Sequence, residues 1–423
     1  MLDIKDIRKN PQKYRDGLKK KGAEDKVDKV LELDRERRNK ITKADELKAL
    51  RNRVSEEIGE LKRNGEDAED KINEMRKVSE KISELDDHIS EVEDKRDNIL
   101  IKLPNLPHES VVVGEREEDN KFIKDWGDKL EAGFELKDHL VLGEYQDILD
   151  FDRGAKISGS GFPLYKNEGA RLERALVNYM LDFHVEDGYQ EIFPPFLVTR
   201  DAATGTGQLP KLEEDMYNTK EDDLFLIPTA EVPVTNIHRE EIIPEKDLPI
   251  KYAAYSGCFR REAGSYGKDT RGLSRLHQFN KVEMVQFVRP ENSYEFHEKL
   301  LERAESVLQK LGLHYRVVNL CTGDLSFAAA KCYDIEVWAP GSEKYFEVSS
   351  VSNFEDFQAR RASIRYRRSD NNEVAHLHTL NGSGLATPRL MIALMEKYQT
   401  KDGNILIPKP LQSYTGFKKI EKY

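Results

Sequence analysis

Residues 255–287 bring together side chains of the kinds that bind a nucleotide. The stretch has the alternating pattern of two strands around a polar middle that contains glycines. Alternation places Arg260 and Glu262 on one face of the first strand, and Phe279 and Glu283 on one face of the second. If the two faces coincide, they present a guanidinium for phosphate, a ring for base stacking and carboxylates that accept from amino groups. A charged, exposed hairpin without a ligand is the alternative interpretation.

The middle and the second strand of this stretch add positive charge. Lys268, Arg271 and Arg275 lie in the connecting segment, where several cations suit a triphosphate. Lys281 falls on the same face of the second strand, and the pattern assigns it no role. The residues by themselves therefore indicate nucleotide binding.

The string FRREAGSYGKDTRGLSRLHQFNKVE (residues 259–283) resembles motif 2 of the class II aminoacyl-tRNA synthetases and is very similar to its form in seryl-tRNA synthetases. The resemblance covers essentially all 423 residues, with no departure at the key positions. It implies that Arg260 grips the ATP α-phosphate and the carboxylate side of serine. It also implies that Glu262 accepts from the adenine amino group and that Phe279 stacks on the ring. The implied ATP contacts in this motif also include Arg261 and Leu276.

The segment LFLIPTAEVPVTNIH places Thr229, Ala230 and Glu231 directly after an apolar strand, in a turn bracketed by two prolines. A carboxylate at a rigid strand end is well placed to bind an ammonium group. From the residues alone, the simpler explanation is that Glu231 is a favourable charge at the N-terminus of a short helix. The family resemblance implies instead that Thr229, Ala230 and Glu231 bind serine.

Glu347 and Ser350 lie near the end of the second of two strands predicted within residues 333–361, which a Pro-Gly-Ser turn joins. Their carboxylate and hydroxyl oxygens are hard ligands of the kind that Mg²⁺ prefers. A polar strand edge explains the same residues without a metal. The resemblance implies that Glu347 and Ser350 hold Mg²⁺, and that the ATP contacts run from Glu347 through Val348 and Ser349 to Ser350.

Residues 378–398 are predicted to form a strand, a glycine turn and an apolar helix. Pro388 and Arg389 fall in the first turn of that helix, where free backbone N–H groups and a guanidinium can face an anion. An ion pair between Arg389 and a surface acid is the alternative. The resemblance to motif 3 implies that Arg389 clamps the ATP γ-phosphate, and that Asn381 and Ser383, in the turn, contact serine.

The resemblance implies a two-step reaction that relies on positioning and charge rather than on a protein nucleophile. Serine attacks the ATP α-phosphate to give seryl-adenylate and pyrophosphate, and the terminal ribose of tRNA then takes the seryl group. The implied catalytic residues are Arg260, Glu283 and Arg389, and Glu283 with Ser383 holds the serine hydroxyl. The implied ligands are ATP with Mg²⁺, L-serine and tRNA(Ser), with tRNA(Sec) as a further candidate substrate.

Residues 1–105 are predicted to form a helical arm that ends at Pro104 and Pro107. Apolar residues recur three or four apart in 27–64 and again in 72–99, with an Asn-Gly stop between the two sets. Two such helices fold back as an antiparallel coiled coil, each on the order of 50 Å long. Dimerisation or spacing is the common role of such an arm; the resemblance implies that it binds tRNA(Ser). Its tip half carries basic residues that suit phosphates, namely Lys48, Arg51, Arg53, Lys62, Arg63, Lys71, Arg76, Lys77 and Lys81.

Residues 106–423 are predicted to form the catalytic domain, with an α+β fold in which helices flank an antiparallel sheet. A helix over 169–188 leads into a strand that Pro194 and Pro195 interrupt, which suits a strand at a sheet edge. The resemblance of this pair to motif 1 implies a homodimer. The remaining predictions are an amphipathic helix over 290–311 and a strand from residue 402 on.

Composition indicates a soluble, cytoplasmic protein with an unusually large solvated surface. Of 423 residues, 38% are hydrophobic and 35% charged, and the net charge of −11 argues against a protein that coats nucleic acid generally. Cys258, Cys321 and Cys332 lack paired metal-ligand spacing, which favours a reducing compartment. The sequence contains no apolar run of membrane-spanning length and no secretory signal, so no membrane association is expected.

Three alternatives remain open at this point. A class II synthetase for another amino acid is disfavoured by Thr229, Glu231 and Glu283. A truncated paralogue that aminoacylates carrier proteins is disfavoured by the intact arm. A non-enzymatic coiled-coil adaptor leaves the residues of motif 2 and Arg389 unexplained.

Overall fold

The computed structural model describes residues 1–262 and 272–422. The chain divides into two compact units, Met1–Pro104 and Asn105–Tyr423, which are called the N-terminal and the C-terminal unit below. Within the described residues, every helix is too short or too polar to cross a membrane.

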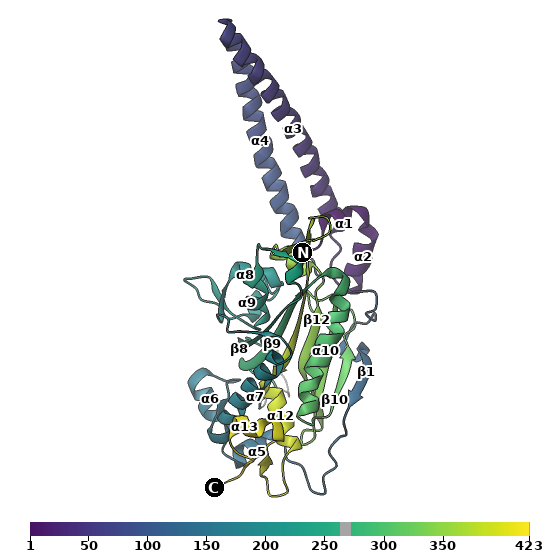
Figure 1. The fold of residues 1–423 in the computed structure, drawn as a ribbon, viewed down its shortest axis with the longest axis vertical. Helices are drawn as coiled ribbons and strands as arrows, with labels where there is room; N and C mark the ends of the chain where they lie inside the picture. Colours follow the sequence, from purple (N-terminus) through teal and green to yellow (C-terminus); the bar gives the residue numbers. More distant parts are fainter. Residues whose placement is uncertain (263–271, 423) are drawn as a thin grey trace. The chain divides into compact units, whose positions relative to one another are not determined.

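The N-terminal unit consists of helices, two of which are long and lie side by side (Figure 1). Its helices are α1 (Ile4–Lys9), α2 (Pro11–Lys20), α3 (Val27–Asn64) and α4 (Glu69–Leu100). Gly65 ends α3 in the left-handed conformation, with φ of 75°, which glycine adopts without steric cost. The predicted antiparallel pair of helices is confirmed.

An apolar seam holds the two long helices together. From α4 it contains Met75, Val78 and Ile82, which pack against apolar residues of α3 between Leu47 and Ile58. Ion pairs flank the seam, such as Lys48–Asp86 at 3.0 Å and Lys71–Glu57 at 2.6 Å. These pairs are exposed, so the seam contributes most of the stabilisation.

An eight-stranded sheet organises the C-terminal unit, in the order β1-β10-β11-β12-β15-β9-β8-β4. Every neighbouring pair is antiparallel except β4 and β8, which are parallel. The strands are β1 (Lys121–Trp126), β10 (Tyr315–Asn319), β11 (Lys331–Ala339), β12 (Lys344–Asn353), β15 (His378–Ala386), β9 (Gln278–Val288), β8 (Ile250–Phe259) and β4 (Gln190–Ile192). The predicted α+β fold with an antiparallel sheet is confirmed.

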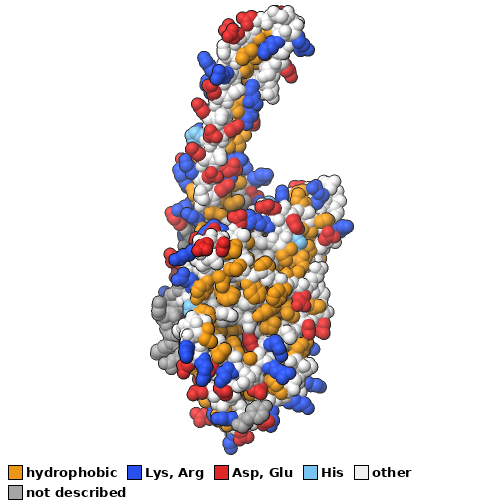
Figure 2. Space-filling model, turned by 90° about the vertical axis from the view of Figure 1, so that its left-hand side faces the viewer, with side chains coloured by type: hydrophobic (Ala, Val, Ile, Leu, Met, Phe, Trp, Pro, Cys, Tyr) orange, Lys and Arg blue, Asp and Glu red, His pale blue; other side chains and the backbone are white. Residues whose placement is uncertain are grey.

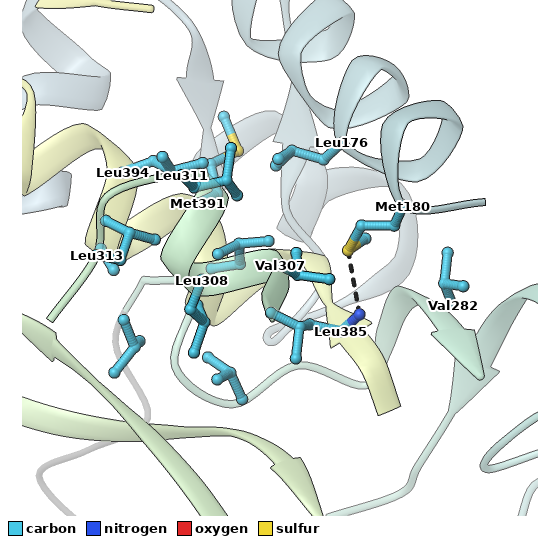
Figure 3. Close-up of a cluster of buried hydrophobic side chains, with 14 of the residues drawn as sticks. Leu176, Met180, Val282, Val307, Leu308, Leu311, Leu313, Leu385, Met391 and Leu394 are labelled. Carbon is cyan, nitrogen blue, oxygen red and sulfur yellow. Dashed lines mark hydrogen bonds between the residues drawn. The ribbon is translucent and has the colours of Figure 1, made fainter. Parts of the chain in front are cut away.

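Three helices cover one face of this sheet, namely α7 (Asn167–Val185), α10 (Ser293–Lys310) and α12 (Thr387–Lys397). Figure 3 shows how their apolar side chains meet, with Met180 of α7 accepting a hydrogen bond from the backbone of Leu385. Because strand residues alternate, Val282 and Met284 of β9 join this core. The residues between and beside them point to the opposite face.

The opposite face carries a second, smaller core and leaves part of the sheet open. Val285 and Phe287 of β9 pack there with residues of α9 (Glu231–Thr235) and α11 (Phe357–Arg361). Toward the other end of β9, the same face presents Phe279, Lys281 and Glu283. The sheet therefore separates a closed apolar side from a side on which polar groups gather.

Pro194 and Pro195 divide the predicted strand into two strands of different sheets. The first is β4, at the edge of the large sheet, and the second is β5 (Leu197–Thr199), which pairs with β6 (Leu224–Leu226). Proline cannot donate to a strand ladder, so the ladder ends at this point. The prediction of one C-terminal strand is wrong, because β16 (Ile405–Leu406) and β17 (Lys419–Ile420) enclose α13 (Gln412–Thr415).

The remaining elements are short. The helices are α5 (His139–Tyr145), α6 (Phe151–Ser158) and α8 (Arg200–Thr206). The strands are β2 (Leu149–Asp150), β3 (Leu164–Tyr165), β7 (Ile242–Pro244), β13 (Arg365–Arg367) and β14 (Val374–His376).

Candidate active site

A cavity of about 840 Å³ opens on the sheet face opposite α7, α10 and α12. Strands β9, β12 and β15, the start of α9, the N-terminus of α12 and the segment just beyond β8 contribute to its wall. The predicted site residues that line it are Thr229, Glu231, Arg260, Glu262, Leu276, Phe279, Glu283, Glu347, Val348, Ser350, Asn381, Ser383 and Arg389. The cavity thus brings together predicted site residues that lie up to 160 positions apart in the sequence.

Strand β9 supplies one side of the cavity. Phe279 pairs with Cys258 of β8, and Glu283 pairs with Ala254, so the two side chains point to the same face four residues apart. Arg260 lies just beyond the end of β8, and its backbone N–H still donates to the carbonyl of His277 at 2.9 Å. The Arg260 guanidinium lies 5.1 Å from the centre of the Phe279 ring, within the range of a cation–π contact.

The prediction that Arg260 and Glu262 lie on a strand is wrong, because β8 ends at Phe259. Glu262 has φ of 49°, so the chain turns away from the strand direction there. Both side chains nevertheless line the cavity, and Arg275 lies 3.2 Å from the Glu262 carboxylate. Lys268 and Arg271, predicted to add positive charge, lie outside the described residues.

Arg389 joins three parts of the cavity wall. It lies in the first turn of α12, after Pro388, as predicted. Its Nε donates to the carbonyl of Ser274 at 3.0 Å and its Nη1 donates to the carbonyl of Glu347 at 2.8 Å. The Glu347 carboxylate is 3.5 Å from the same Nη1. The guanidinium is thereby held between the start of α12, β12 and the segment before β9.

Oxygen ligands gather beside Arg389. The Ser350 hydroxyl lies 2.6 Å from Oδ1 of Asp334 and 3.2 Å from Oε1 of Glu347. Burial and the neighbouring Glu347 raise the pKa of Asp334 well above its ordinary value. Within residues 1–262 and 272–422, no three His, Cys, Asp or Glu side chains converge as a metal centre. Two carboxylates and a hydroxyl, all hard oxygen donors, still fit a Mg²⁺ that is shared with a phosphate ligand.

Acidic side chains also gather at the start of α9. Glu231 is the first residue of this helix, is only 7% exposed and accepts from Nε2 of Gln358 at 2.6 Å. Burial, together with the neighbouring Glu283, raises the pKa of Glu231 to about 7. Lys281 forms an ion pair with Glu283, and its Nζ lies 2.8 Å from Oγ1 of Thr229. The arrangement holds two carboxylates and one ammonium group in a confined space.

Two family models match the chain. The seryl-tRNA synthetase N-terminal domain matches residues 1–107, and the tRNA synthetase class II core domain (G, H, P, S and T) matches residues 211–398. A serine--tRNA ligase of Chloroherpeton thalassium is 55% identical over 99% of this chain and 100% of its own length. The chain belongs to the seryl-tRNA synthetase family. It is a class II aminoacyl-tRNA synthetase.

Solved structures agree with this membership of the seryl-tRNA synthetase family. Seryl-tRNA synthetase from Pyrococcus horikoshii, crystallised with ATP, is 42% identical over the whole of both chains, with a TM-score of 0.93. The cytoplasmic serine-tRNA ligase of Naegleria fowleri, in complex with AMP, is 33% identical with a TM-score of 0.88, over 100% of this chain and 99% of its own. A prolyl-tRNA synthetase of Giardia lamblia, 15% identical with a TM-score of 0.56 over 66% of this chain and 57% of its own, shares the fold alone.

Three predicted site residues of this seryl-tRNA synthetase family member do not line the cavity. Ala230 is fully buried in the second core. Arg261 is exposed, and its backbone N–H donates to the carbonyl of Asp215 at 2.9 Å. Ser349 is buried, and its hydroxyl donates to the carbonyl of Ser383 at 2.7 Å. Ser349 therefore lies behind the wall of the cavity.

The glycine turn predicted around Asn381 and Ser383 is also wrong, because both residues lie within β15. Gly384 of β15 allows a neighbouring side chain to pack against the backbone. A side chain at Gly384 would collide with the ring of His184, whose Nε2 lies 2.8 Å from the Gly384 carbonyl. A run of glycines and polar residues resembles a turn in sequence, and only the neighbouring strands and α7 distinguish the two.

Sequence reasoning assigned no role to Lys281 and did not single out Asp334 or Gln358. For Lys281 the signal was present, because alternation places it between Phe279 and Glu283. Asp334 pairs with Ser350 across β11 and β12, and Gln358 belongs to α11. The positions of Asp334 and Gln358 depend on strand register and helix packing, which the residue pattern of one sequence does not determine.

Proposed function

We propose that the cavity binds ATP and L-serine, and that it activates serine to seryl-adenylate before transfer to tRNA(Ser). Membership of the seryl-tRNA synthetase family supports this proposal. The observation that carries it is that one cavity gathers two sets of groups, one suited to a nucleotide and one to a small amino acid.

The nucleotide set consists of Arg260, Glu262, Phe279 and Arg389. In the proposed complex adenine stacks on Phe279, with its amino group donating to Glu262, and stacking contributes roughly 1–3 kcal/mol. Arg260 stabilises the negative charge that develops at the α-phosphate while serine attacks. Arg389 holds the γ-phosphate, so that pyrophosphate leaves in line with the attacking carboxylate.

Mg²⁺ is proposed to bind at Glu347 and Ser350, whose oxygens fit its preference. When bound, the ion would neutralise phosphate charge. Glu347 also accepts from Arg389, so its carboxylate is already oriented toward the region assigned to the phosphates.

The serine set consists of Thr229, Glu231, Glu283, Asn381 and Ser383. Glu231 is proposed to bind the α-ammonium group, and Glu283 with Ser383 to hold the side-chain hydroxyl. Alanine would leave these buried groups unpaired, and a site of this kind rejects such an analogue by about 10⁴-fold. Larger side chains, such as that of threonine, are proposed to be excluded sterically.

The arm of the N-terminal unit is proposed to bind tRNA(Ser), with tRNA(Sec) as a second candidate. The match of residues 1–107 to the family's N-terminal domain supports this role. Replacing residues 51–79 by a short glycine-rich turn should retain pyrophosphate exchange and abolish tRNA charging. Retained charging would contradict the proposed role of the arm.

A homodimer is proposed to form at the β4 edge of the sheet. Phe193, directly after β4, is 76% exposed and lies 5.8 Å from Phe196 and 6.2 Å from Tyr255, measured between ring centres. Leu197 beside them is 44% exposed. Figure 2 shows hydrophobic side chains gathered over much of one face of the C-terminal unit. Exposed aromatic clusters beside a sheet edge are typical of protein interfaces.

ATP–pyrophosphate exchange measured with each of the twenty amino acids tests the proposed function. Serine alone should support exchange, and Glu283→Ala should abolish it without preventing ATP binding. Exchange with another amino acid, or near-normal serine exchange in Glu283→Ala, would refute the assignment. Charging of total tRNA then identifies the acceptor.

A further inference from the structure

Lys281 is a buried lysine in the wall of the cavity. Its side chain is on β9 between Phe279 and Glu283, and the residue is only 6% exposed. Burying an ammonium group is costly unless it is paired. Lys281 is paired twice, with the Glu283 carboxylate and with the Thr229 hydroxyl at 2.8 Å.

The Thr229 hydroxyl has all its hydrogen-bonding capacity in use. It accepts from Nζ of Lys281 and from the backbone N–H of Glu231 at 3.2 Å, and it donates to Oε2 of Glu283 at 3.3 Å. A hydroxyl offers one hydrogen and two lone pairs, so these three bonds fix its direction. Because an ammonium group can only donate, Lys281 forces the hydroxyl hydrogen toward Glu283.

We propose that Lys281 is a positioning residue of the serine pocket, which fixes Thr229 and Glu283 and balances one of the two carboxylates. This inference rests on the proposed function. Lys281 supplies the counter-charge of Glu283. Glu231, the second carboxylate of the cavity wall, is then left to face the α-ammonium group of serine.

The surroundings of Lys281 contain few other charges. Glu283 lies on the same strand, Glu231 on α9 and Cys258 on β8, with Arg260 beyond the end of β8. Lys281 lowers the pKa of Glu231, whereas burial and Glu283 raise it. Removing the lysine would therefore shift the titration of Glu231 upward. A lysine that only stabilised the fold would leave the KM for serine of the folded variant unchanged.

Lys281→Met is the informative variant, measured by pyrophosphate exchange. The KM for serine should rise about 30-fold or more, because one partner of a buried charge pair is lost. The KM for ATP should change less than about threefold. The pH midpoint of kcat/KM for serine should move upward by about one unit, because an opposing carboxylate loses its counter-charge. Lys281→Gln, which keeps a donor for Thr229 without a charge, should show the same pH shift.

Lys331→Met is the matched control. Lys331 is a buried lysine of β11 in the same sheet, 3.4 Å from Glu298, and it lies outside the cavity wall. This control should leave the serine KM and the pH midpoint unchanged. If wild-type protein exchanges with serine and both Lys281 variants match it in serine KM and pH midpoint, the inference is overturned. If wild-type protein does not exchange with serine, the proposed function itself fails.

Discussion

Replacing Glu231 by glutamine is expected to abolish serine activation and at the same time to stabilise the fold at alkaline pH. Glutamine has nearly the same shape, and its carbonyl can keep the hydrogen bond from Nε2 of Gln358. The substitution removes the charge and replaces the other carboxylate oxygen by an NH2 group. The variant therefore separates what Glu231 does for the proposed serine site from what it costs the folded protein.

The stabilisation follows from the raised pKa of Glu231. Burial and Glu283 raise this pKa from an ordinary value of 4.5 to about 7. The folded state then binds the proton more tightly than the unfolded state, so stability is lost as the pH rises from 4.5 to about 7. A shift of this size corresponds to about 3 kcal/mol. Glu231→Gln should therefore be more stable than wild type by about 2–3 kcal/mol at pH 8, and by about 1 kcal/mol or less at pH 5.

Urea unfolding at pH 8 and at pH 5, followed by tryptophan fluorescence, measures this difference. Both tryptophans of the chain, Trp126 and Trp338, lie in the C-terminal unit, so the signal reports the unit that contains Glu231. Glu295→Gln, at an exposed helix position, is a matched control and should change stability by less than about 0.5 kcal/mol.

Two results would refute this reasoning. Equal stability of variant and wild type at pH 8 would show that Glu231 carries no desolvation cost. A difference that stays constant between pH 5 and pH 8 would show that any gain arises from packing rather than from the charge. Serine-dependent exchange near the wild-type rate would separately contradict the role of Glu231 at the α-ammonium group.

Two further predictions concern the nucleotide side of the cavity. Phe279→Leu should raise the KM for ATP about 5- to 150-fold in pyrophosphate exchange, because the stacking surface is lost, while the KM for serine changes little; an unchanged ATP KM would place adenine elsewhere. Arg389→Lys keeps the charge but cannot donate at once to the carbonyls of Ser274 and Glu347, so the KM for ATP should rise about tenfold or more, and a wild-type value would show that charge alone suffices.

Part of the fold followed from local sequence. The two long helices were predicted with their turn, because a repeating apolar seam and Gly65 are short-range signals. Pro388 correctly indicated the first turn of α12. The proline pair after β4 indicated a break in the strand. In each case the signal and the structure that it determines lie within a few residues of one another.

The site was predicted as a set of motifs, and their convergence came from the resemblance to a family. Residue patterns gave Arg260, Phe279 and Glu283 as candidates for a common face, yet they extended the strand too far. They also mistook the polar, glycine-containing part of β15 for a turn. Both errors arise because strand ends and strand continuity are decided by the partners of a strand.

Sequence alone determined which chemical groups are available and which short segments carry them. Tertiary structure decided which groups meet. Lys281 contacts Thr229, which lies 52 positions away in the sequence. The pKa of Glu231 is raised because the residue is buried beside Glu283. Register across β8, β9 and β15 and the packing of α9 set these distances, and electrostatic interactions depend on distance and burial rather than on separation along the chain.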